Sequence, residues 1–179
     1  TDGLVASGTY GSGTIPATGA GARMMWYPKK AAFRAGYVDG TQWDDANIGA
    51  YSVAGGDRNT ASGVASVISG GWSSKTSGQF ATVGGGKNNI ISSNYSTVGG
   101  GQNNVAQGNT HATVGGGINN TASGLYATIS GGNNNSATGG QDFVGGGSGS
   151  TASGGNAVVG GGALHIASGN YAIIPGGYN

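Results

Sequence analysis

The chain has 179 residues, of which 42 are glycine and only 7% are charged, with no cysteine and a formal net charge of +1. This near-neutral composition argues against a nucleic-acid partner or an anionic membrane surface, both of which require clustered Lys and Arg, and the lack of cysteine excludes disulfides. The apolar runs are only a few residues long, which excludes a membrane-spanning segment.

The first 48 residues differ from the rest of the chain, because they carry bulky side chains and no repeat. They hold Trp26, Tyr27 and Trp43, and four of the seven positively charged residues. Atypical sequence beside a repeat array often covers its exposed terminal unit. We therefore predict that residues 1–48 form an N-terminal cap or trimerisation segment. The alternative is a recognition surface, since aromatic and basic side chains are enriched at binding hot spots.

Residues 49–179 contain a 15-residue repeat that is marked in each copy by paired or tripled glycines. One interval has 16 residues, where the segment QGNTHATV (107–114) holds an extra residue. Glycine accepts positive φ without steric cost, so each run predicts a tight turn. The predicted turn residues of the nine copies are Gly56, Gly71, Gly86, Gly101, Gly117, Gly132, Gly147, Gly162 and Gly177.

Two further columns predict two short strands in each copy. A β-branched residue, which packs well on a pleated surface, stands three positions before each marker. These predicted core residues are Val53, Ile68, Val83, Val98, Val114, Ile129, Val144, Val159 and Ile174. Five positions after the marker stands a mostly small residue: Ala61, Thr76, Ile91, Ala106, Ala122, Ala137, Ala152 or Ala167. Helices of this length, full of glycine, would be unstable.

Stacking these copies at about 4.8 Å predicts an all-β fold, a parallel β-roll or β-solenoid of about nine coils over residues 49–179. Each side chain would then lie above its equivalent in the next coil. Two asparagine columns are expected to stack at the turns, at positions 88, 103, 119 and 134 and at positions 89, 104, 120 and 135. Each coil offers the core about one Val or Ile and one or two Ala. We therefore expect the coils to gain stability by associating with copies of the same chain.

The repeats resemble the head repeats of the YadA-like trimeric autotransporter adhesins and of related bacterial surface and fibre proteins. The best examples are YSVAGGDRNTASG (51–63) and YATISGGNNNSATG (126–139). The resemblance implies a left-handed parallel β-roll that forms a homotrimer. The tripled glycines and the 15-residue period depart from the family pattern. The segment 21–49 is also similar to a stretch that precedes such repeats in bacterial surface proteins and in fibres ending with a self-cleaving chaperone domain.

No constellation of residues predicts catalysis, a cofactor or a bound metal. Asp44 and Asp45 are adjacent acids that we interpret as the start of a turn, with a cation site as the alternative. His111 and His165 lie in different columns, more than three coils apart, so one chain does not bring them to one metal. The glycine runs lack the Ser or Thr of a phosphate-binding loop, and only Asp57 fits a calcium-binding β-roll.

Two outward columns are candidate contact surfaces. The first contains Thr82, Thr97, Thr113 and Thr128, the flat ladder that an ice-binding solenoid would present, and continues as Phe143, Val158 and Ile173. The second contains Phe80, Tyr95, His111, Tyr126 and Tyr171, whose rings we expect to stack along the rod. The residues predicted to contact a protein or glycan are Phe80, Tyr95, Tyr126 and Tyr171, with Trp26 and Tyr27 of the cap.

Together these features predict a non-catalytic structural or adhesive head of an extracellular trimeric bacterial fibre or adhesin. It would attach to a host-surface protein, matrix or glycan, and the three identical faces would add avidity. We expect it at the bacterial cell surface or in a secreted or phage-like fibre. The alternatives are a segment of a phage-tail or contractile-injection-system fibre, an ice-binding solenoid and a polysaccharide-cleaving tailspike.

Overall fold

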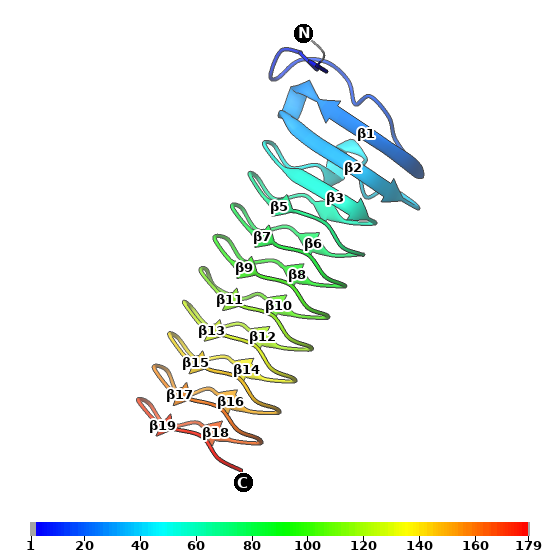
Figure 1. Ribbon diagram of the computed structural model, residues 1–179. Coiled ribbons are helices and arrows are strands. Elements are labelled where there is room, and N and C mark those ends of the chain that lie inside the picture. Colours follow the sequence, from blue (N-terminus) through cyan, green and yellow to red (C-terminus); the bar gives the residue numbers. More distant parts are fainter. Residues whose placement is uncertain (1–2, 179) are drawn as a thin grey trace.

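The computed structural model describes residues 3–178, which form a rod of stacked parallel coils with a cap at one end (Figure 1). The predicted all-β solenoid is confirmed. An 11-stranded sheet, called sheet A, and an 8-stranded sheet, called sheet B, form two sides of the rod. None of the helical segments in residues 3–178 is long and apolar enough to cross a bilayer.

The cap extends sheet A with an antiparallel hairpin of β1 (Gly21–Tyr27) and β2 (Ala32–Val38). The 3-10 turn η1 (Pro28–Lys30) joins the two strands, and η2 (Asp45–Asn47) follows β2. Strand β2 pairs in parallel with the first solenoid strand, so the hairpin continues the ladder of sheet A. A separate cluster of buried cap side chains contains Met25, Tyr27, Ala32, Val38, Trp43 and Ile48.

The solenoid strands alternate between the two sheets, and most are two residues long. Below the hairpin, sheet A contains β3 (Val53–Asp57), β5 (Val67–Ile68), β7 (Thr82–Val83), β9 (Thr97–Val98), β11 (Thr113–Val114), β13 (Thr128–Ile129), β15 (Phe143–Val144), β17 (Val158–Val159) and β19 (Ile173–Ile174). Sheet B contains β4 (Thr60–Ala61), β6 (Lys75–Thr76), β8 (Ile90–Ile91), β10 (Val105–Ala106), β12 (Thr121–Ala122), β14 (Ser136–Ala137), β16 (Thr151–Ala152) and β18 (Ile166–Ala167). The ninth copy contributes β19 to sheet A, and sheet B ends at β18.

The core is a single file of Val, Ile and Ala between the two sheets. The predicted residues from Ile68 to Val159 are buried, and Ile174, in the last strand, is partly buried. The prediction for Val53 is wrong, because this side chain is 37% exposed and Ala54 takes the inner position. In the first copy only one residue separates the inward strand residue from the turn glycine, whereas the later copies have two. Ala54 therefore pairs with Ile68, and β3 continues without a break to Asp57. The extra residue of segment 107–114 instead lies in a turn, and β11 keeps register with β9.

The glycine corners are required by the close approach of successive coils. The nine predicted turn glycines all have positive φ. At Gly101 a Cβ atom would lie 2.1 Å from Gly117 O, far inside van der Waals contact. A side chain there would push two coils apart, so glycine is needed for both backbone conformation and spacing.

Buried asparagines join each corner to the next. Asn104 Nδ2 donates to Gly100 O of its own coil at 2.9 Å and to Gly117 O of the next coil at 2.8 Å. Asn104 Oδ1 accepts the backbone N–H of Asn120 at 3.0 Å. The same pattern is made by Asn59, Asn89, Asn120 and Asn135, while Ser74 and Ser150 occupy the same column and accept only the backbone N–H. The predicted stacking of asparagines at 89, 104, 120 and 135 is thus confirmed as a hydrogen-bonded ladder.

We predict that Asn104→Ala lowers the free energy of unfolding by about 2–4 kcal/mol, because Gly100 O and the N–H of Asn120 lose their partner, while Gly117 O keeps the N–H of Gln102. Asn104→Ser should cost about half as much, since serine in this column still accepts the backbone N–H. Urea denaturation of both variants measures the difference. Equal stability of the alanine and serine variants would contradict the ladder's role.

Candidate functional site

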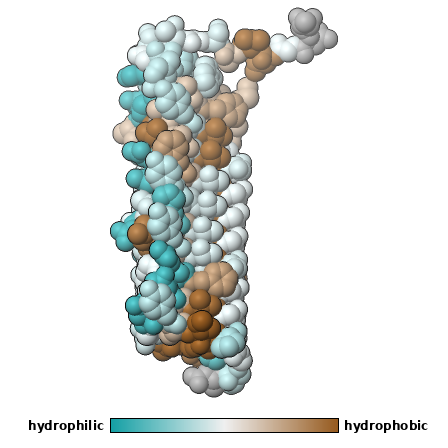
Figure 2. Space-filling model, turned by 90° about the vertical axis from the view of Figure 1, so that its left-hand side faces the viewer, coloured by the Kyte–Doolittle hydropathy of each residue, from teal (hydrophilic) through white to brown (hydrophobic). Residues whose placement is uncertain are grey.

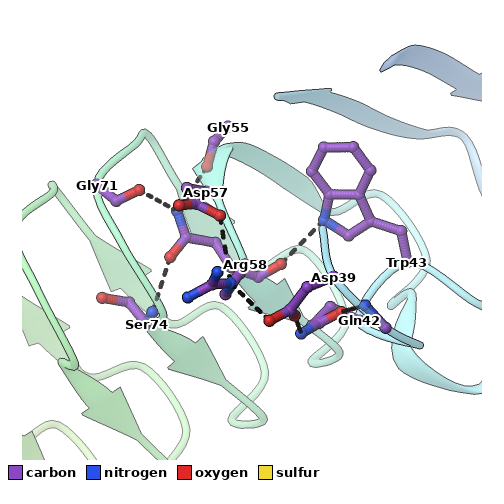
Figure 3. A network of polar contacts seen from close by, with 10 residues as sticks. Asp39, Gln42, Trp43, Gly55, Asp57, Arg58, Gly71 and Ser74 are labelled. Carbon is purple, nitrogen blue, oxygen red and sulfur yellow. Dashed lines mark hydrogen bonds and ion pairs between the residues drawn. The ribbon is translucent and has the colours of Figure 1, made fainter. Parts of the chain in front are cut away.

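The loop that follows β2 lies over the outer face of sheet B and is locked to the first coil (Figure 3). One oxygen of Asp39 accepts a hydrogen bond from Gln42 Nε2 at 2.7 Å, and the other pairs with Arg58 Nε at 2.7 Å. The N–H of Gly40 donates to Gln42 Oε1 at 3.0 Å. Both ends of this network are therefore fixed, one on the loop and one on the solenoid.

Trp43 fastens the same loop to the interior. Its side chain is fully buried, and Nε1 donates to Asn59 O at 2.9 Å. Asn59 is the first member of the asparagine ladder, and Figure 3 shows how its contacts with Gly55, Gly71 and Ser74 continue from the indole. The position of the loop is thus coupled to the register of the coils.

A groove of about 490 Å³ lies between this loop and sheet B. Hydroxyl and amide side chains make up most of its wall: Thr41, Gln42 and Asn47 from the loop, and Thr60, Ser62, Ser73 and Ser77 from the coils. Thr76 also borders it, but its side chain is buried in the core. Arg58 and Lys75 are its two cations, and Ile90 is its exposed apolar side chain, while Ile91 beside it is buried in the core. We name it the junction groove. Its chemistry suits a polar ligand, because such side chains both donate and accept hydrogen bonds.

Positive charge gathers around the same end of the rod. Arg58 Cζ lies 5.5 Å from the ring centre of Trp72, and Lys87 Nζ lies 4.7 Å from it. The indole therefore makes cation–π contacts with one residue before it in the chain and one after it. The charged residues within the repeats are Asp57, Arg58, Lys75, Lys87 and Asp142, and the last of these is buried. The exposed charges of the solenoid therefore all belong to its first three copies.

Asp44 and Asp45 serve as cap contacts in the structure. Asp44 Oδ1 accepts the N–H of Gly19 at 2.8 Å. Asp45 Oδ1 accepts the hydroxyl of Tyr27 at 2.8 Å and lies 3.1 Å from Lys30 Nζ. The hydrogen bond from Tyr27, followed by that from Lys30, lowers the pKa of Asp45, while burial and the same contact raise the pKa of Tyr27.

Arg34 closes the capped end of the core. It pairs with Ala54 in sheet A and is fully buried. Nη1 donates to Phe33 O at 2.8 Å and to Ser52 O at 3.0 Å, and Nη2 donates to Ser52 Oγ at 2.8 Å and to Ala61 O at 2.9 Å. Burial lowers the pKa of Arg34 to about 10, so it remains protonated at neutral pH. Ser52 O and Ala61 O already accept the N–H groups of Phe33 and Gly49, so the guanidinium adds a second hydrogen bond to each of them at this end of the solenoid.

The predicted aromatic column forms a stack along one edge of the rod. Successive ring centres of Phe80, Tyr95, His111 and Tyr126 lie 5.0–5.1 Å apart. All four residues have positive φ, which costs a side chain with a Cβ roughly 1–2 kcal/mol. Ring stacking, worth about 0.5–1.5 kcal/mol per pair, offsets much of this strain. The rings cover one another's faces, so their edges are what the surface presents.

The structure separates the six predicted contact residues. Phe80, Tyr95 and Tyr126 are each about half exposed within the stack, and Tyr171 is 70% exposed near the far end. Trp26 is half-buried and lines an apolar hollow of the cap. The prediction for Tyr27 is wrong, because it is only 1% exposed. Its ring fills the cap core, where its hydroxyl needs the partner that Asp45 provides.

The two histidines lie apart, in different columns, as expected. His111 belongs to the aromatic stack, and His165 takes the asparagine position of the last full coil, with Nε2 3.1 Å from Gly177 O. Among residues 3–178, no three His, Cys, Asp or Glu side chains come together in a way that could hold a metal ion.

Sequence reasoning missed the junction groove. Its residues come from the loop at 41–47 and from three successive coils, and no periodic pattern connects these segments. One signal was present in the sequence, namely that Asp57, Arg58, Lys75 and Lys87 cluster in the first copies. Comparison with known proteins adds no functional information: no protein-family model matches the chain, and no curated protein matches it significantly.

We predict that Asp45→Asn lowers stability near neutral pH by about 0.5 kcal/mol, a small value because this carboxylate is half exposed. The folded-state pKa of Asp45 is depressed, so its contribution is present above the unfolded-state pKa and is lost as the pH falls through the folded-state value. Urea denaturation from pH 7 down to about pH 3 should therefore show wild type and variant converging in acid. Tyr27→Phe should shrink the same difference, and a gap that stays constant with pH would refute the assignment.

We predict that Tyr95→Ala destabilises the protein by about 1–2 kcal/mol more than Tyr171→Ala, because only Tyr95 stacks against two rings. Both residues have positive φ, so the backbone strain is common to the two variants. Thermal unfolding followed by circular dichroism compares them. Equal losses would show that the stack contributes nothing to stability.

Proposed function

We propose that the chain is the structural and adhesive head of an extracellular homotrimeric fibre and that it has no catalytic role. The observation that carries this proposal is one uncharged, in-register column of outward residues in sheet A. Its outward column pairs strand by strand from Phe33 through Val53, Val67, four threonines, Phe143 and Val158 to Ile173. A charge-free column of this length, apolar at both ends, is suited to burial against a copy of itself.

The outer face of sheet A has a distinct hydropathy pattern. Figure 2 faces the side of the rod that lies at the left of Figure 1, where the odd-numbered strands from β5 to β19 are, and shows brown side chains gathered toward both ends of this side and pale ones between. Phe33, Val53 and Phe143 are each 36–37% exposed, and Ile173 is 69% exposed. Exposed β-branched and aromatic residues in one line support a protein contact.

A second feature supports close approach of another chain. Gly70, Gly85, Gly100, Gly116, Gly131 and Gly161, the middle glycines of their corners, have no atom within 4 Å of a Cβ placed on them. Their φ angles also lie outside the left-handed region. The chain's own fold therefore does not require glycine at these positions. Contact with a neighbouring backbone would require it.

If three rods associated in parallel about one axis, each coil would lie at the same height as the equivalent coil of the other two chains. Identical outward residues would then meet, and the remaining faces would be displayed three times. Weak contacts to a surface protein, matrix or glycan gain strength from such display. A fibre of a phage tail or contractile injection system would use the same architecture.

A second candidate function is ice binding, which the four in-register threonines of sheet A favour. Val67 and Phe143 interrupt this ladder at its two ends. Measurement of thermal hysteresis separates the candidates, since an ice-binding solenoid depresses the freezing point and a fibre head does not.

We predict a sedimentation mass of three chains for the wild type and of one chain for Thr113→Lys, because a lysine in the middle of sheet A would bring three ammonium groups to the axis. Thr121→Lys is the matched control, since it lies outward in sheet B of the same coil and should leave the trimer intact. Analytical ultracentrifugation measures both. A monomeric wild type, or loss of assembly only in Thr121→Lys, would overturn the proposed arrangement.

A further inference from the structure

We propose that the junction groove binds an acidic glycan, through hydrogen bonds to sugar hydroxyls and an ion pair from Lys75 to a sugar carboxylate. This inference rests on the proposed adhesive function and names the class of ligand that one surface of the head would take. It assigns a single site to each chain, at the capped end of the rod.

Contacts within the protein itself determine the shape of the groove, so the groove is formed before a ligand binds. The loop wall is held by the Asp39–Arg58 ion pair and by the bond from Trp43 to Asn59. The floor consists of outward positions of β4, β6 and β8, which are fixed in register by the ladder of sheet B. A volume of about 490 Å³ is within the range of sites for small ligands. Such a preformed groove avoids the cost of ordering its walls on binding.

The lining matches the hydrogen-bonding character of a saccharide. Sugar hydroxyls donate and accept, as do the hydroxyl and amide groups of Thr41, Asn47, Thr60 and Ser73. Among the described residues, Asn47 uses only Nδ2 within the protein, in a bond to Thr41 O, so its Oδ1 remains available. The exposed side chain of Ile90 offers a small apolar area for the C–H groups of a sugar ring.

The charge of the groove selects an anion. Lys75 is exposed, and its Nζ makes no ion pair or hydrogen bond with any residue that the structure describes. Arg58 uses only Nε in its ion pairs, so neither Nη atom is engaged by a described acidic side chain. No carboxylate is part of the lining, since Asp39 and Asp57 are not among the groove residues. Arg58 is already paired with Asp39 and Asp57, so Lys75 is the groove cation that a ligand carboxylate would find without a competing acid among the described residues.

The other coils lack this combination. The outward column of sheet B continues below Ile90 as Val105, Thr121, Ser136, Thr151 and Ile166, with no cation. The loop at 41–47 lies only over the first coils. The position of the cation in sheet B and the position of the loop wall are independent observations, and both single out the junction groove.

The test is binding of the full chain to tetragalacturonate, sialyllactose and a hyaluronan tetrasaccharide, each compared with its carboxyl-reduced neutral form, by titration calorimetry. We expect at least one acidic oligosaccharide to bind and its neutral form to bind more weakly. Lys75→Gln should weaken acidic binding roughly tenfold, as loss of a charge-assisted contact does. Lys29→Gln removes the same charge from an exposed cap position outside the groove and should change nothing.

A second pair of variants tests the place of binding. Thr60→Trp should block the groove and abolish binding, whereas Thr121→Trp, the equivalent outward position two strands beyond Ile90, should not. Circular dichroism confirms that each variant is folded. Failure of all three acidic probes to bind, or binding that survives Thr60→Trp, overturns the inference and leaves the fibre assignment standing. The fibre assignment fails separately, through a monomeric sedimentation mass.

Discussion

The structure depends on the bond from each buried asparagine to the glycine corners of two successive coils. The interior of a 15-residue coil is narrow, so its inner carbonyls find partners in the coil above or below, although the buried hydroxyl of Thr76 has none. Asn104 supplies two of these bonds and accepts a third, and it can do so only because Gly117 approaches closely enough that a Cβ on Gly101 would collide with it. Glycine and asparagine therefore act as one unit, and neither explains the spacing alone.

Strict register along the rod turns each position of the repeat into a column with its own environment. Inward columns hold mainly Val, Ile and Ala, while outward columns are free to vary, which is why exposed charge can be confined to the first three copies. The aromatic stack shows the cost of this freedom. Tyr95 sits at a corner with positive φ that glycine would adopt more easily, and its stacking with Phe80 and His111 offsets the strain.

Periodicity predicted the solenoid, its core column from Ile68 to Val159 and its glycine corners, because these features repeat and each copy corroborates the others. It was wrong for Val53, where the copy is one residue short and only strand pairing reveals that Ala54 faces inward. It was also wrong for Tyr27, since residue type alone does not tell a buried ring in the cap from a contact surface. The junction groove escaped prediction because the loop that forms its wall has no repeat, and its position depends on tertiary contacts of Asp39 and Trp43.

The two sheets of the rod differ in a way that lets the proposed assembly and the proposed ligand site coexist. The strands of sheet A from β5 to β19 carry no charged residue, and the middle glycines of the corners leave room for another chain, whereas sheet B carries Lys75 and the wall of the cap loop. Association through sheet A would leave the junction groove of each chain on the outside. Because Arg34 and Trp43 fix the cap to the first coil, all three grooves would then lie at the same height at one end of the rod, where a branched or polymeric acidic glycan could engage more than one of them.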